Sequence, residues 1–179
     1  YNNLGNAFKD IKLFEEAMKS YETAIELEPN SAEIHNNFGS LLSENLSRHD
    51  DAIISFKKAI SLDLYFYPAH LNLGHTFVAL NQYESAVEAY KSTMTIKPDL
   101  GNILGNLLNA KMNCCNWEKY NSLLNIKNIK KEFLDGKKVI APFFLLSLID
   151  DPALQRKATE TNIYSFHPKN NDLTLTGLY

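Results

Sequence analysis

A pattern of residues that recurs along the first part of the chain constrains the fold more than any other feature. Gly5, Gly39 and Gly74 recur at spacings of 34 and 35 residues. Three further positions repeat in step with the glycines, an alanine, an aromatic and a small residue: Ala17, Ala52 and Ala86; Tyr21, Phe56 and Tyr90; Ala24, Ala59 and Thr93. A period of this length predicts stacked pairs of helices, because one unit alone cannot bury its apolar face.

Residues 1 to 98 resemble the tetratricopeptide repeat, with its aromatic, Leu-Gly, Ala, aromatic, Ala and Pro landmarks. The resemblance implies an all-α fold, a right-handed superhelix of helix-turn-helix units followed by a mixed helical C-terminal extension. The helices are predicted at 1–11, 14–27, 31–45, 50–62, 67–80 and 83–96. Ser31 and Asp99 are predicted N-caps. The second unit is one residue longer, and the turn at 45–50 is the expected place for the insertion.

Three domains are predicted: three repeats at 1–98, a degenerate fourth repeat at 99–125, and a linker with the start of a junction at 126–179. In the fourth unit Leu108 stands where glycine is expected, and the helix near 117–124 has lost its alanine. A degenerate last unit suits a cap or a junction, because its outer face meets something different from another repeat.

Composition excludes several classes of partner and site. The net charge of −3 and pI near 6.0 give no reason to expect nucleic acid or a membrane as partner. Two adjacent cysteines, Cys114 and Cys115, indicate a reducing compartment, so a cytoplasmic location is expected, with each cysteine a small buried residue. We find no nucleophile–base pair and no ligand spacing, so no catalytic residue, metal or cofactor is expected in this chain. His35 and His70 are interpreted as packing residues.

A second resemblance covers residues 99 to about 160. The segments Gly105-Asn-Leu-Leu-Asn-Ala-Lys-Met112, Cys115-Asn-Trp117, Ala141-Pro-Phe-Phe-Leu-Leu-Ser and Asp150-Asp-Pro-Ala-Leu-Gln155 are similar to the junction in bacterial O-GlcNAc-transferase-like, SPINDLY-type glycosyltransferases. That family implies a parent enzyme that transfers N-acetylglucosamine from UDP-GlcNAc to proteins, with catalytic lobes that this chain lacks. The chain would then be the acceptor-recognition region, inactive alone. The alternatives are a free-standing scaffold that joins proteins and a repeat arm of another enzyme.

One set of polar residues is a candidate binding site. Asn3, Asn37, Asn72 and Asn106, here called the asparagine ladder, occupy the same position in four successive units. The O-GlcNAc-transferase resemblance implies that such a ladder binds the backbone of an extended polypeptide in the concave groove. Four neighbours are predicted to share this face: Asn6, Ser40, His75 and Asn109. The competing interpretation is that asparagine is common at this position for local solvation.

Overall fold

The computed structural model describes residues 1–115, and within them every regular element is helical. The elements are α1 (Asn2–Asp10), α2 (Phe14–Leu27), α3 (Ala32–Ser40), a π-helical turn η1 (Leu41–Asn45), α4 (His49–Leu62), α5 (Tyr67–Ala79), α6 (Tyr83–Ile96) and α7 (Ile103–Asn113). The prediction of an all-α fold is confirmed for this part of the chain. The predicted helix bounds agree with the observed ones to within one or two residues for the first three units.

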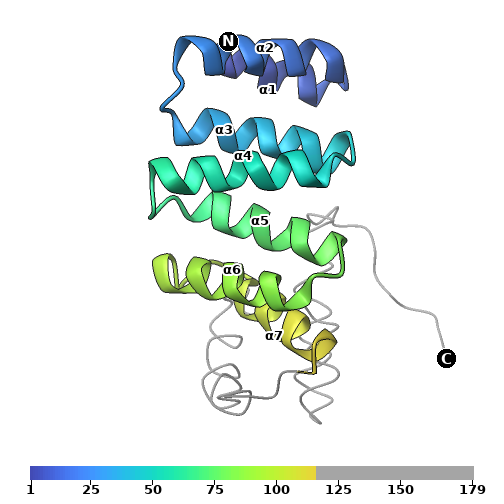
Figure 1. Cartoon of the computed structure of the whole chain (residues 1–179), viewed down its shortest axis with the longest axis vertical. Helices are drawn as coiled ribbons and strands as arrows, with labels where there is room; N and C mark the ends of the chain where they lie inside the picture. The colour runs from blue at the N-terminus through green and yellow to red at the C-terminus, as the bar shows by residue number, and fades with distance from the viewer. Residues whose placement is uncertain (116–179) are drawn as a thin grey trace, which may run out of the picture. The chain divides into compact units, whose positions relative to one another are not determined.

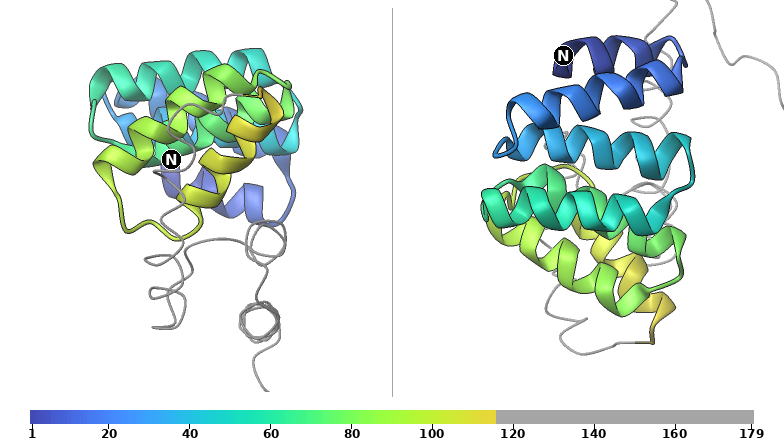
Figure 2. Two further views of the ribbon diagram at one scale, coloured as in Figure 1. Left: turned by 90° about the horizontal axis from the view of Figure 1, so that it is seen from below. Right: turned by 45° about the horizontal axis from the view of Figure 1, so that its top comes forward.

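The helices pack as consecutive pairs. Helix α1 packs on α2, α3 on α4 and α5 on α6, and the pairs follow one another in chain order along the stack (Figures 1 and 2). Neighbouring pairs meet where α2 packs on α3 and α4 packs on α5. Within residues 1–115 no helix is long and apolar enough to cross a membrane.

The repeated glycines make room for the repeated aromatics. A Cβ atom built on Gly5, Gly39 or Gly74 would lie 2.7, 2.7 and 2.5 Å from the ring of Tyr21, Phe56 and Tyr90 respectively, the aromatic residue of the same unit. Each ring therefore covers the glycine of its own unit. Tyr21 also contacts Phe38 of the next unit, with ring centroids 6.3 Å apart.

The repeated alanines are fully buried. Ala17, Ala52 and Ala86 are all 0% exposed. In the second unit Ala52 belongs to one apolar cluster with Leu42, Phe56 and Leu73. This cluster draws on η1, α4 and α5, so it joins the second unit to the third.

The extra residue of the second unit is absorbed inside the helix rather than in the loop at 45–50. The first helices of units 1 and 3 end with bonds from Leu13 N to Phe8 O and from Gln82 N to Phe77 O. The equivalent bond in unit 2, from Arg48 N to Leu42 O, spans one residue more. The π turn η1 accommodates this residue, with Leu46 N donating to Leu41 O at 3.3 Å.

One of the two N-cap predictions is confirmed, and the other is wrong. Ser31 caps α3 as predicted, with Ile34 N donating to its Oγ at 3.4 Å. Asp99 does not cap the next helix, because the chain turns through Leu100–Asn102 and α7 begins only at Ile103. The first helix of the fourth unit is therefore present, whereas its partner near 117–124 and the junction at 126–179 lie outside the described residues.

Candidate peptide-binding site

The asparagine ladder lies on the first helices of the repeats, at equivalent places on α1, α3, α5 and α7. Asn3 is exposed, and the other three are half-buried. The sequence predicted that these side chains serve a ligand in the groove, which implies that they are not engaged in contacts between helices. The structure corrects this for three of them, because Asn37, Asn72 and Asn106 each hydrogen-bond a side chain of the preceding unit.

These bonds form a continuous chain across three repeats. Asn72 Nδ2 donates to Asn36 Oδ1 at 3.1 Å, and Asn36 Nδ2 donates to Asn37 Oδ1 at 3.4 Å. Asn37 Nδ2 then donates to Asn2 Oδ1 at 3.1 Å, and Asn2 Nδ2 donates to Glu33 Oε1 at 3.0 Å. We call these four asparagines, with Glu33 at their end, the amide chain. Since its members come from α1, α3 and α5, it links repeats. Asn36 is buried at 6% exposure, so the amides that a ligand can reach are those of Asn2, Asn37 and Asn72.

The amide chain ends at the third unit, and Asn106 of the fourth unit has a different kind of partner. The position of Asn2 and Asn36 is occupied in the third unit by Leu71, which has no polar side-chain atom. Asn106 instead lies 3.2 Å from the Nε2 atom of His75, one helical turn further along α5. An amide nitrogen is a donor, so Nε2 accepts and the ring is neutral with its proton on Nδ1.

The four predicted neighbours of the ladder all follow the glycine position by one residue, and their surroundings differ. Asn6 Oδ1 accepts from the Tyr21 hydroxyl at 2.7 Å. The His75 ring lies edge-on to the Tyr90 ring, with the ring centroids 5.7 Å apart. Asn109 Oδ1 accepts from Asn113 Nδ2 at 2.8 Å. Ser40 is buried at 8% exposure, so it offers a ligand almost no surface. It directly follows Gly39, where the Phe56 ring presses on α3.

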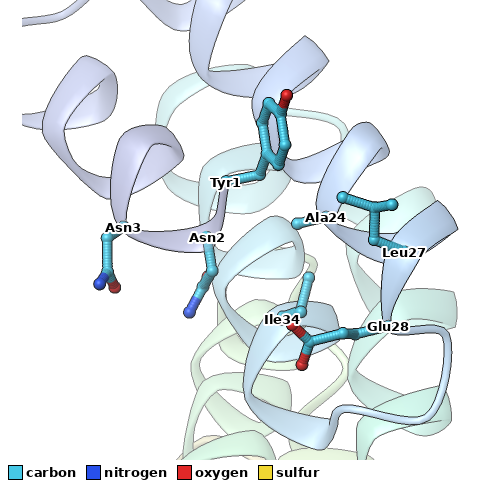
Figure 3. Close-up of a pocket in the computed structure, with 7 residues that line it drawn as sticks. All are labelled: Tyr1, Asn2, Asn3, Ala24, Leu27, Glu28 and Ile34. Carbon is cyan, nitrogen blue, oxygen red and sulfur yellow. The ribbon is translucent and has the colours of Figure 1, made fainter.

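A pocket opens on this face at the N-terminal end of the repeats. Its volume is about 220 Å³, and it lies between the start of α1, the end of α2 and the start of α3 (Figure 3). It is lined by Tyr1, Asn2, Asn3, Ala24, Leu27, Glu28 and Ile34. Two amide-bearing residues, Asn2 and Asn3, therefore border a hollow that a side chain of a ligand could enter.

Burial shifts the pKa of two groups beside this face. Burial, with a smaller contribution from the Asp10 carboxylate, raises the pKa of Tyr21 to about 12, so its hydroxyl stays protonated and donates to Asn6. Burial of the His75 ring lowers its pKa, and the Glu44 carboxylate partly opposes this shift. Although part of the His75 side chain is exposed, its ring packs against Tyr90, which explains the loss of solvation.

We expect His75 to make the stability of the repeats fall in mild acid. Its folded-state pKa lies below the usual 6.5, so its contribution is complete above that value and is lost as the pH falls from about 6.5 through the folded pKa. Chemical denaturation of the wild type and His75→Gln at pH values from about 7.5 to about 5 measures this. The wild type should lose more stability over that interval than the variant. Parallel curves would show that His75 does not titrate in this way.

The remaining candidate ligands have structural partners. His35 Nε2 donates to Pro29 O at 2.9 Å, and His70 Nε2 donates to Leu64 O at 3.1 Å, which supports their interpretation as packing residues. Among residues 1–115 no group of three or more His, Cys, Asp or Glu side chains could hold a metal ion. Cys114 is half-buried, but Cys115 is exposed at the end of α7, so its predicted burial is wrong.

Models of known families match three stretches of this chain. A model described as TPR repeat matches residues 5–45, and two described as tetratricopeptide repeat match 32–65 and 69–104. The chain carries tetratricopeptide repeats. This confirms the first resemblance and leaves the glycosyltransferase resemblance a prediction, since most of its motifs lie beyond residue 115.

Known TPR proteins extend this comparison. The chain is 35% identical over 94 residues to small glutamine-rich tetratricopeptide repeat-containing protein 2 of Mycosarcoma maydis, covering 52% of this chain and 26% of that protein. It thus spans about a quarter of that relative. A crystal structure of MamA matches the structure of this chain with a TM-score of 0.66 at 25% identity. The match covers 75% of this chain and 78% of that chain. The first TPR of Spaghetti (RPAP3), bound to the HSP90 peptide SRMEEVD, matches with a TM-score of 0.59 at 19% identity. The match covers 62% of this chain and 87% of that chain.

Three members of the amide chain are missing from the predicted site. Asn2, Asn36 and Glu33 are not among the site residues that the sequence predicts. The signal available in the sequence was the doublet Asn-Asn, which occurs at 2–3 and again at 36–37. In the second doublet, Asn36 Oδ1 accepts from Asn72 of the next unit, and Asn37 Nδ2 donates to Asn2 of the preceding unit.

Proposed function

We propose that this TPR domain joins proteins by holding an extended polypeptide along the first helices of its repeats. The observation that carries the proposal is the amide chain, a row of polar groups fixed across α1, α3 and α5. A primary amide has donors and an acceptor, so it can pair with the N–H and C=O of a peptide backbone. Every polypeptide offers those groups, and such a face would therefore accept many sequences.

The repeats themselves support an extended ligand. Stacked helical pairs expose one long surface built from equivalent positions, and this is how solenoid proteins bind partners. The RPAP3 repeats bound to an HSP90 peptide are a solved example of the same fold with a peptide ligand. Attachment of this domain to a UDP-GlcNAc-dependent glycosyltransferase is a narrower proposal. It depends on the motifs between 105 and 155, and the repeats alone serve a scaffold equally well.

The test of this proposal is peptide binding by an Asn3→Ala, Asn37→Ala and Asn72→Ala variant. Each lost hydrogen bond should cost about 0.5–1.5 kcal/mol of binding free energy. Affinity measured by fluorescence anisotropy should therefore fall alike for several extended peptides of unrelated sequence. Asn30→Ala, an exposed asparagine in the turn before α3, is the matched control and should bind as the wild type does.

Stability has to be followed in the same experiment. Asn37 and Asn72 also bond neighbouring repeats, so the triple variant is expected to unfold more easily than the wild type. The single variant Asn3→Ala separates the two effects, because the Asn3 side chain forms no hydrogen bond within residues 1–115. Unchanged peptide affinity in a folded Asn3→Ala and in the folded triple variant would contradict the proposed function.

A further inference from the structure

The carboxylate of Glu33 fixes the direction of the amide chain. An ionised carboxylate only accepts hydrogen bonds, so Asn2 must present its NH2 group to Glu33 and its oxygen to Asn37. Asn37, Asn36 and Asn72 are oriented in the same way, because each donates through its nitrogen to the oxygen of the next member toward Glu33. The last member, Asn72, donates through its nitrogen, and its Oδ1 atom accepts no side-chain hydrogen bond within residues 1–115. Both ends of the amide chain therefore present acceptor oxygens.

Two more carboxylates stand beside this face. The charge of Asp10, at the end of α1, contributes to the raised pKa of Tyr21, whose hydroxyl donates to Asn6. The charge of Glu44, in η1, raises the pKa of His75, the partner of Asn106, against the larger lowering by burial. Asp10, Glu33 and Glu44 are all exposed; Asp10 lies on the first helix of unit 1, and the two glutamates lie on the first helix of unit 2, which is α3 continued by η1. Negative charge is therefore present on the first helices of units 1 and 2, which carry three of the four asparagines of the amide chain.

Positive charge on the first helices is scarce. Elements α1, α3, η1 and α5 contain three acidic residues and one basic residue, Lys9. Helix α7 adds Lys111, but that side chain is buried, with 3% exposure. A ligand lying along these helices meets acceptor oxygens and negative charge. Complementary ligands carry hydrogen-bond donors and positive charge.

We propose that the preferred ligand of this face is an extended peptide rich in lysine or arginine. This inference rests on the proposed function, since it names the chemistry of the polypeptide held there. The amides bind the backbone, while Glu33 and Glu44 pair with basic side chains of the peptide. Acidic peptides bind weakly, because Lys9 is the one accessible cation that the described first helices offer them.

Binding of charge-matched probes to the full chain tests the inference. The acidic heptapeptide SRMEEVD is compared with SRMKKVK and SRMQQVQ, which keep its length and its remaining residues. We expect SRMKKVK to bind most tightly and SRMEEVD least, with the difference shrinking as salt rises. Glu33→Gln and Glu44→Gln should each weaken SRMKKVK roughly two- to fivefold and leave SRMQQVQ nearly unchanged. Glu22→Gln, an exposed glutamate on α2, is the matched control and should change nothing.

The possible results separate this inference from the proposed function. Equal affinity for the three probes, or tighter binding of SRMEEVD, overturns the preference for basic peptides while the proposed function stands. The same holds if neither glutamate variant weakens SRMKKVK. Absence of binding by every probe, with the protein folded by circular dichroism, overturns the proposed function together with the inference. Glutamine is nearly isosteric with glutamate, so these variants should fold.

Discussion

Replacing Phe56 by alanine is expected to lower the free energy of unfolding by about 3–5 kcal/mol. The Phe56 ring is 1% exposed and covers Gly39 on α3. It also packs with Leu42 and Leu73, which belong to η1 and α5. Its removal therefore leaves a cavity at the place where the second and third units join.

Urea denaturation followed by circular dichroism measures this loss, and Ile54 provides the control. Ile54 lies two residues before Phe56 on α4 but is 67% exposed. Ile54→Ala should change stability by no more than about 0.5 kcal/mol. Similar losses in the two variants would mean that α4 does not present the Phe56 face to its neighbours as described.

Replacing Ala52 by leucine is expected to destabilise the repeats by about 1–3 kcal/mol through overpacking. Ala52 has no exposed surface and lies in the same cluster as Phe56. Three additional carbon atoms there must displace α4 from its neighbours or force side chains out of favoured rotamers. Because leucine has nearly the same helix propensity as alanine, the loss would reflect packing and not the helix itself.

The same substitution at an exposed site isolates the packing effect. Ala7 lies on α1 and is exposed, so Ala7→Leu should alter stability by less than about 0.5 kcal/mol. Thermal or urea unfolding of both variants decides the matter. An Ala52→Leu protein as stable as the wild type would contradict the close approach of the helices on which the repeat register depends.

The sequence alone determined the repeat and most of what depends on local contacts. The period of 34 to 35 residues, the helix pairs, and the burial of Ala17, Ala52 and Ala86 could all be predicted from the periodic positions of small and aromatic residues. Such positions are fixed by helix geometry, in which residues three and four apart share a face. The Ser31 cap was predictable for the same reason, since its bond to Ile34 spans three residues.

The tertiary structure decided which side chains meet between units. Asn37 pairs with Asn2 and Asn72 with Asn36, partners 35 and 36 residues apart that do not occupy equivalent repeat positions. That offset follows from how one helical pair sits against the next, which a period cannot specify. The π turn η1 likewise required the packed structure, because an extra residue can enter a helix or a loop and the neighbouring contacts determine which costs less free energy.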